Sequence, residues 1–226
     1  MSEHIVIRSR EKPAQLFLLF HGVGSDAANL GPLGQRIAAE FPQAAVVCIR
    51  APDACDLGQG RQWFSIRGIT EENRPLRIHE TMPRFVETVK GMQQRYGVAP
   101  EATALVGFSQ GAIMALESVR SGHHLAGRVV ALAGRFTCLP EQAPEHSTLH
   151  LIHGKNDAVV AYGHTVAAAE RLIRLGGDVT ADVLPFTGHE VSELMTETLL
   201  ERLKGHIPQR LWASVQNEAP VLRPIG

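Results

Sequence analysis

A serine between two glycines, in the segment Gly107-Phe-Ser-Gln-Gly111, is the first feature of the chain whose residue types and spacing could do chemistry. An apolar run precedes it and a helix-like stretch follows it. In such a strand-to-helix turn the serine hydroxyl points outward, and the glycines let neighbouring backbones approach without a Cβ clash. We therefore predict that Ser109 is a nucleophile. The alternative is a glycine-flanked serine in an ordinary turn.

A serine hydroxyl needs a nearby base to take its proton and a carboxylate to hold that base in one tautomer. In folds with this turn the acid and then the histidine follow the serine along the chain. His189 alone lies in a loop directly after a predicted strand and before a helix, whereas His150 and His153 lie inside a strand. Catalytic groups of open sheets gather at the carboxyl ends of strands, so His189 is the predicted base. The alternative is a surface loop histidine.

The acid should come from a similar loop at the end of a strand. Asp157 lies four residues after His153, the last residue of a predicted strand. Asp178 lies in the turn before its strand, at the wrong end of the sheet, and Asp182 lies within that strand. Asp157 is therefore the predicted acid, although an aspartate here could instead cap the following helix.

A carbonyl attacked by serine becomes an oxyanion, which is stabilised by preorganised donors, commonly two backbone N–H groups. Gln110 follows the nucleophile at the start of a helix and would supply one donor. The glycine-rich turn Phe20-His-Gly-Val-Gly24 would supply the other, and we favour Val23 N–H. A phosphate cradle is a weaker interpretation, because the turn lacks both G-x-G-x-x-G spacing and a P-loop lysine.

These residues must be positioned by strands that alternate with helices. The apolar runs are mostly continuous, which is typical of strands buried on both faces of a parallel sheet. Residues 5–8 would add an antiparallel edge strand. The pattern predicts a doubly wound, mostly parallel α/β sheet flanked by helices. The predicted strands are residues 15–20, 45–49, 103–107, 128–132, 148–153 and 179–184, and the predicted helices are 27–40, 78–96, 110–121, 159–175 and 190–206.

The chain of 226 residues fits one domain, which we place at residues 1–207. Residues 50–77 are polar and glycine-rich and are predicted to form a binding loop. No insertion is long enough for a separate cap domain. Residues 208–226 are predicted to be a C-terminal tail whose apolar residues, Leu211, Trp212, Val215 and Leu222, could dock on the domain or on a second subunit, so a homodimer is possible.

Composition narrows the class of partner. Twenty-two Lys and Arg balance 23 Asp and Glu without a long block of like charge, which gives no support for nucleic-acid binding. No apolar run approaches the roughly 18 residues that span a bilayer, and no secretory leader is recognisable, so we expect a cytoplasmic protein. The three cysteines show no Cys-x-x-Cys spacing and no His-Glu-x-x-His pattern occurs, so we expect no metal. The predicted partner is a small molecule.

Taken together, these motifs resemble the phospholipase and carboxylesterase family of the α/β-hydrolases. The resemblance covers nearly the whole chain and is carried by segments 19–24, 61–65, 107–115, 153–157 and 188–189. It implies an α/β-hydrolase fold and a hydrolase that needs no cofactor and acts on carboxylic esters or thioesters. It also implies that Trp63 borders the substrate pocket, although a tryptophan that anchors its loop to the core would explain the same residue.

The sequence therefore predicts a serine carboxylesterase that hydrolyses short-chain esters through an acyl-enzyme on Ser109. Without a cap domain the pocket should be shallow, which favours short acyl groups. An acyl thioesterase or a lysophospholipase would use the same catalytic residues, so the sequence leaves these activities open. A non-catalytic binding protein that retains the fold is disfavoured, because a decayed site would be expected to lose at least one of the predicted groups.

Overall fold

A computed structural model describes residues 4–211 of the chain. Its centre is a seven-stranded sheet with the order β1-β3-β2-β6-β7-β8-β9, in which all neighbouring pairs are parallel except β1 with β3. The predicted antiparallel edge strand and the predicted parallel sheet are both present. The strands are β1 (Ile5–Arg8), β2 (Gln15–Phe20), β3 (Ala44–Ile49), β6 (Thr103–Phe108), β7 (Arg128–Leu132), β8 (Thr148–Gly154) and β9 (Val179–Leu184).

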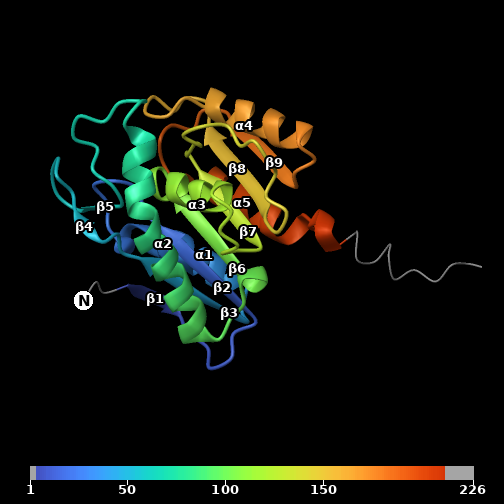
Figure 1. Ribbon diagram of the computed structural model, residues 1–226. Coiled ribbons are helices and arrows are strands. Elements are labelled where there is room, and N and C mark those ends of the chain that lie inside the picture. Colours follow the sequence, from blue (N-terminus) through green and yellow to red (C-terminus); the bar gives the residue numbers. More distant parts are fainter. Residues whose placement is uncertain (1–3, 212–226) are drawn as a thin grey trace, which may run out of the picture.

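Helices cover both faces of the sheet, as a doubly wound fold requires. Helices α2, α3 and α4 lie on one face, and α1 and α5 lie on the other (Figure 1). Every α-helix in the described part of the chain packs against this sheet, and none belongs to a separate cap domain. The helices are α1 (Gly31–Glu40), α2 (Arg74–Tyr96), α3 (Gln110–Arg120), α4 (Gly163–Arg174) and α5 (Glu193–Gly205).

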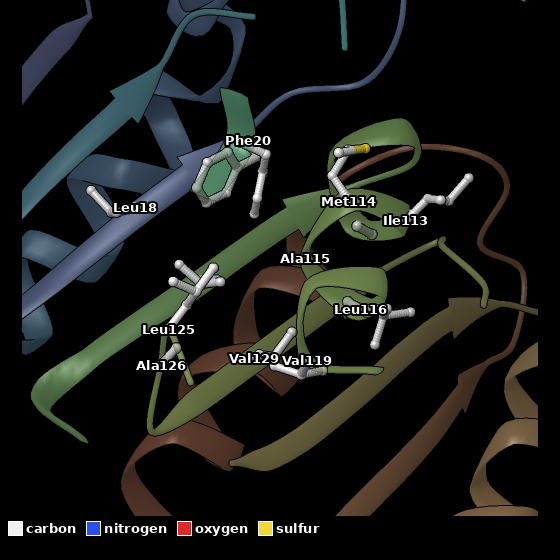
Figure 2. Packing of buried hydrophobic residues seen from close by; sticks show 14 of the residues in the cluster. Leu18, Phe20, Ile113, Met114, Ala115, Leu116, Val119, Leu125, Ala126 and Val129 are labelled. Atoms are coloured by element: carbon white, nitrogen blue, oxygen red, sulfur yellow. The ribbon is translucent and has the colours of Figure 1, made fainter. Parts of the chain in front are cut away.

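The hydrophobic core is divided by the sheet into two clusters. The larger cluster lies between the sheet and α2, α3 and α4, and Figure 2 shows part of it, with Leu18 and Phe20 of β2 and Met114 and Leu116 of α3. The smaller cluster joins the opposite face of the sheet to α1 and α5. Burial on both faces explains why the central strands are continuous apolar runs and not alternating ones.

Several predicted helix boundaries differ from the structure. The stretch predicted as one helix at 159–175 begins as a helix only at Gly163, and it is preceded by a turn in which the backbone N–H groups of Val159 and Val160 donate to the side chain of Asp157. The stretch predicted at 27–40 divides into a 3-10 turn, η1 (Ala27–Leu30), and α1. A second 3-10 turn, η2 (Pro100–Ala102), precedes β6.

The predicted loop at residues 50–77 contains more regular structure than its composition indicates. A short antiparallel hairpin, β4 (Asp53–Ala54) with β5 (Arg61–Gln62), stiffens its first half. Helix α2 begins at Arg74 and not at residue 78, and Pro75 stands in its first turn, where a missing N–H costs nothing. The hairpin is joined to the turn after β2, because Gly24 N–H donates to Arg61 O over 2.9 Å.

The beginning of the predicted tail lies against the domain. Gln209 N–H donates to Asp178 Oδ2 over 3.0 Å, and Arg210 donates to Thr148 Oγ1 over 2.9 Å. The predicted docking of Trp212, Val215 and Leu222 lies outside the described residues, and the homodimer remains a prediction. Within residues 4–211, no helix is both long and apolar enough to cross a membrane.

Candidate active site

Ser109 stands at a strained turn between β6 and α3. Its backbone has φ 53° and ψ −116°, a region that non-glycine residues rarely adopt. The flanking glycines explain how the turn can be so tight. A Cβ on Gly107 would lie 2.5 Å from Ala112 N, and one on Gly111 would lie 2.2 Å from Phe20 O. Only glycine at both positions lets α3 begin this close to the sheet.

Three residues that are distant in sequence meet at this turn. Ser109 Oγ lies 2.9 Å from His189 Nε2, and His189 Nδ1 lies 2.7 Å from Asp157 Oδ2. The Asp157 side chain is completely buried, whereas that of His189 is 18% exposed. The structure therefore places the three predicted residues in one hydrogen-bonded row whose acid is fully buried.

Backbone contacts between two neighbouring loops bring Asp157 and His189 together. Lys155 N–H donates to Leu184 O over 2.8 Å, and Asn156 N–H donates to Thr187 O over 2.9 Å. Gly154 is the point of closest approach, because a Cβ there would lie 2.3 Å from Thr187 O. The loops after β8 and β9 are thus held side by side, which fixes the distance between the acid and the histidine.

The Asp157 carboxylate is held in its ionised form. Burial alone would raise its pKa, but hydrogen bonds from His189 and from the amides of Val160 and Val159 outweigh burial, and the pKa lies below its usual value. Both amides donate to Oδ1 over 2.8 Å, which leaves Oδ2 to face His189. A fixed carboxylate of this kind holds the imidazole with its proton on Nδ1, so that Nε2 can accept a proton from serine.

The turn after β2 lies directly against Ser109, since a Cβ on Gly22 would lie 3.1 Å from Ser109 Cβ. His21 fixes this turn. Its Nε2 accepts from Ala51 N over 3.0 Å, so its Nδ1 carries the proton and donates to Gly22 O over 2.7 Å. Because C=O and N–H point in opposite directions across a trans peptide, this bond also orients the Val23 N–H. Burial lowers the pKa of His21, which keeps the ring neutral.

Gln110 begins α3, so its N–H is among the first amides of a helix and lacks a partner within the helix. Its side chain has a second task, which the sequence did not reveal. Oε1 accepts from Trp63 N over 2.7 Å, and Nε2 donates to Phe64 O over 2.7 Å. The Gln110 amide thus holds residues 63–64 of the long loop against the start of the helix.

Trp63 does not border an open pocket, which corrects one of the two interpretations of this residue. Its side chain is 1% exposed and packs against Phe20 and Phe85 in the core. The indole N–H donates to His21 O over 3.0 Å. Trp63 therefore anchors the loop and supports the turn that carries Val23, and the large apolar ring is buried because its one polar atom finds an acceptor.

Two histidines near the site were not identified from the sequence as functional. His21 lies in a glycine-rich motif in which the sequence predicts a role only for the backbone, and His153 lies within a strand, where the sequence predicts no catalytic role. His153 Nε2 lies 3.2 Å from Asp157 Oδ2. Among residues 4–211, no group of three or more His, Cys, Asp or Glu side chains is arranged to hold a metal ion.

A mostly parallel sheet, with a serine at a strained strand-to-helix turn and its histidine and aspartate partners on later strand ends, defines an α/β-hydrolase. Comparison with known families agrees. The family model for phospholipases and carboxylesterases matches residues 1–207. The chain belongs to this family and is therefore a hydrolase of the carboxylesterase type.

Individual relatives support this assignment. Esterase YpfH of Escherichia coli K12 is 47% identical over 208 residues, which is 92% of this chain and 90% of the relative. Among solved structures, that of esterase PE8 is 26% identical, covers 91% of this chain and 98% of its own, and has a TM-score of 0.79. The acyl-protein thioesterase 2 of Zea mays shares the fold at 22% identity, with a TM-score of 0.72 over 90% of this chain and 98% of its own.

Proposed function

We propose that this enzyme hydrolyses short-chain carboxylic esters through a covalent acyl-enzyme on Ser109. The observation that carries the proposal is the row of two short hydrogen bonds, 2.9 Å from Ser109 Oγ to His189 Nε2 and 2.7 Å from His189 Nδ1 to Asp157 Oδ2. A nucleophile, a base and an orienting acid at these distances are the arrangement that nucleophilic acyl transfer requires.

In the first half of the reaction, Ser109 Oγ attacks the ester carbonyl carbon while His189 Nε2 takes the hydroxyl proton. The carbonyl oxygen becomes an oxyanion between the N–H groups of Val23 and Gln110. When the intermediate collapses, the bond to the alcohol oxygen breaks and His189 returns the proton to that oxygen. The alcohol leaves, and the acyl group remains esterified to Ser109.

In the second half, a water molecule takes the position of the alcohol. His189 removes one proton from this water as its oxygen attacks the acyl-enzyme, and the same two N–H groups stabilise the second oxyanion. Collapse releases the carboxylic acid and returns the proton to Ser109 Oγ. Asp157 stays ionised throughout, because it accepts hydrogen bonds from His189 and from two backbone amides.

The preference for short acyl groups is supported by the arrangement of the helices. In the described part of the chain, each α-helix packs against the sheet, and none belongs to a separate cap domain that could enclose a long chain. The ring of Trp63 is buried against Phe20 in the core, and it therefore does not form the wall of an open acyl groove. Thioesters remain an open alternative class of substrate, because the acyl-enzyme chemistry is the same.

The proposal is tested by hydrolysis of p-nitrophenyl acetate and butyrate by the wild type, Ser109→Ala and Ser118→Ala. Ser118 is a matched control, since it is buried in the same helix and donates to Ala115 O. We expect Ser109→Ala to lose roughly 10⁶-fold in kcat and Ser118→Ala to stay within a few-fold. Comparable activity in all three proteins would refute the role of Ser109.

The acyl preference is tested with p-nitrophenyl esters from acetyl to palmitoyl, beside an acyl thioester and a lysophospholipid. We expect kcat/KM to be highest for acetyl or butyryl esters. A value that rises steadily to palmitoyl, or that is greatest for the thioester or the lysophospholipid, would replace the short-chain ester proposal while leaving the role of Ser109 intact.

A further inference from the structure

His153 lies in strand β8 and is buried beside Asp157, the acid of the proposed active site. Along β8, Leu149 and Leu151 face the α4 side of the sheet, so by the two-residue period of a strand His153 faces the same side. Its side chain and that of Asp157 are both 0% exposed. A buried, polar ring at this place must have its hydrogen-bonding groups satisfied.

The neighbours of His153 determine its tautomer. Nε2 lies 2.8 Å from Val160 O and 3.2 Å from Asp157 Oδ2, and both of these atoms are acceptors. Nε2 must therefore carry the proton. Nδ1 lies 2.8 Å from Thr165 Oγ1, whose hydroxyl can donate to it. The ring is thus neutral, and burial lowers its pKa, which is consistent with this state.

We propose that His153 is a positioning residue that holds Asp157 in place for His189, an inference that rests on the proposed function. Its N–H donates to Val160 O, Nε2 also lies 3.2 Å from Asp157 Oδ2, and the N–H of Val160 in turn donates to Asp157 Oδ1. His153 therefore supports the carboxylate both directly and through the turn. Oδ2 receives one histidine from each side, His153 from the interior and His189 from the active site.

This arrangement assigns separate tasks to the four donors around Asp157. The two amides fix Oδ1, and His153 limits the movement of Oδ2, so that the oxygen remains 2.7 Å from His189 Nδ1. Because His153 does not reach the serine or the substrate, its loss should change the rate of acyl transfer and not the binding of the ester. The expected signature is a lower kcat at nearly constant KM.

The test compares His153→Leu, His153→Asn and His153→Gln with the wild type on p-nitrophenyl butyrate. The glutamine amide reaches about as far as the imidazole Nε2 and can donate toward Asp157, whereas the asparagine amide reaches only about as far as Nδ1. We expect the leucine and asparagine variants to lose about tenfold to a hundredfold in kcat, with KM within about threefold. We expect glutamine to recover most of that loss. Equal kcat values for the asparagine and glutamine variants would overturn the proposal, and this comparison also decides the matter if the leucine variant does not fold.

Two controls separate this role from a general effect on folding. His150→Leu removes another fully buried histidine from the same strand, and it should keep kcat within a few-fold, because His150 bonds to Thr180 and not to Asp157. In an Asp157→Asn background, His153→Leu should lower kcat by less than about threefold, since its partner is already lost. Losses that multiply in the double variant would overturn the proposal.

Failure of the inference can be distinguished from failure of the proposed function by including Ser109→Ala in the same assay. If Ser109→Ala is active, the acyl-enzyme mechanism is wrong. If Ser109→Ala is inactive and His153→Leu matches His150→Leu, the mechanism stands and the positioning role of His153 is wrong.

Discussion

Asp157→Asn should inactivate the enzyme by reversing the tautomer of His189 while leaving the fold in place. Four groups surround the carboxylate, and each one is a donor: the amides of Val159 and Val160 at Oδ1, and His189 and His153 at Oδ2. An asparagine has one acceptor oxygen and one donor NH₂. With its oxygen toward the two amides, its NH₂ must face His189 Nδ1.

That contact is favourable only if His189 Nδ1 gives up its proton, which places a proton on Nε2 opposite Ser109 Oγ. The ring can then no longer accept the serine proton. Turning the amide over would set NH₂ against two backbone N–H groups and would not restore activity. We expect kcat to fall by about 10⁴-fold, the loss known for a triad aspartate replaced by asparagine in another serine hydrolase, or about 5 kcal/mol of transition-state stabilisation.

The assay is steady-state hydrolysis of p-nitrophenyl butyrate, with Asp182→Asn as the control. Asp182 lies on the neighbouring strand and pairs with Arg202, so its variant should stay within a few-fold of the wild type. Adding Asp157→Asn to Ser109→Ala should cause no further loss, because the groups act as a unit. If Asp157→Asn retains a tenth or more of the wild-type kcat, the reasoning about its donors is wrong.

Two further predictions concern stability. Gly111→Ala places a methyl group 2.2 Å from Phe20 O and should lower the free energy of unfolding, measured by urea denaturation, by about 3 kcal/mol. Gly91→Ala on α2 is the control, because a Cβ there meets nothing within 4 Å, and it should raise the free energy of unfolding by up to about 1 kcal/mol. Equal effects of the two substitutions would contradict the steric argument. Burial lowers the pKa of His150 from 6.5 to about 3. Between pH 6.5 and about pH 3 the unfolded chain therefore binds one more proton than the folded chain, and the wild type loses about 1.4 kcal/mol of stability for each pH unit by which the pH falls. His150→Gln lacks this contribution, and from pH 7 to pH 5 it should lose about 2 kcal/mol less than the wild type; parallel pH dependences would show that His150 does not titrate in this way.

Much of the fold could be predicted because it depends on local patterns. Continuous apolar runs indicate strands buried on both faces, and the runs at 15–20 and 128–132 coincide with β2 and β7. Helix starts were predicted less well. Helix α4 begins at Gly163 and not at residue 159, after a turn in which the Asp157 side chain accepts from two backbone amides, and that turn depends on where tertiary contacts hold the side chain.

The sequence by itself predicted Ser109 as the nucleophile, because a serine flanked by glycines between a strand and a helix is typical of such a turn, and the structure shows the turn that the glycines allow. It also determined which strand ends supply His189 and Asp157, because chain order and loop position follow from the pattern of strands. Only the tertiary structure decided the functions of side chains that act through contact. Trp63 and His21 meet beneath the turn that carries Val23, and His153 meets Asp157 in the interior. These pairings depend on how the helices and loops pack against the sheet, and the spacing of residues along the sequence does not predict that packing.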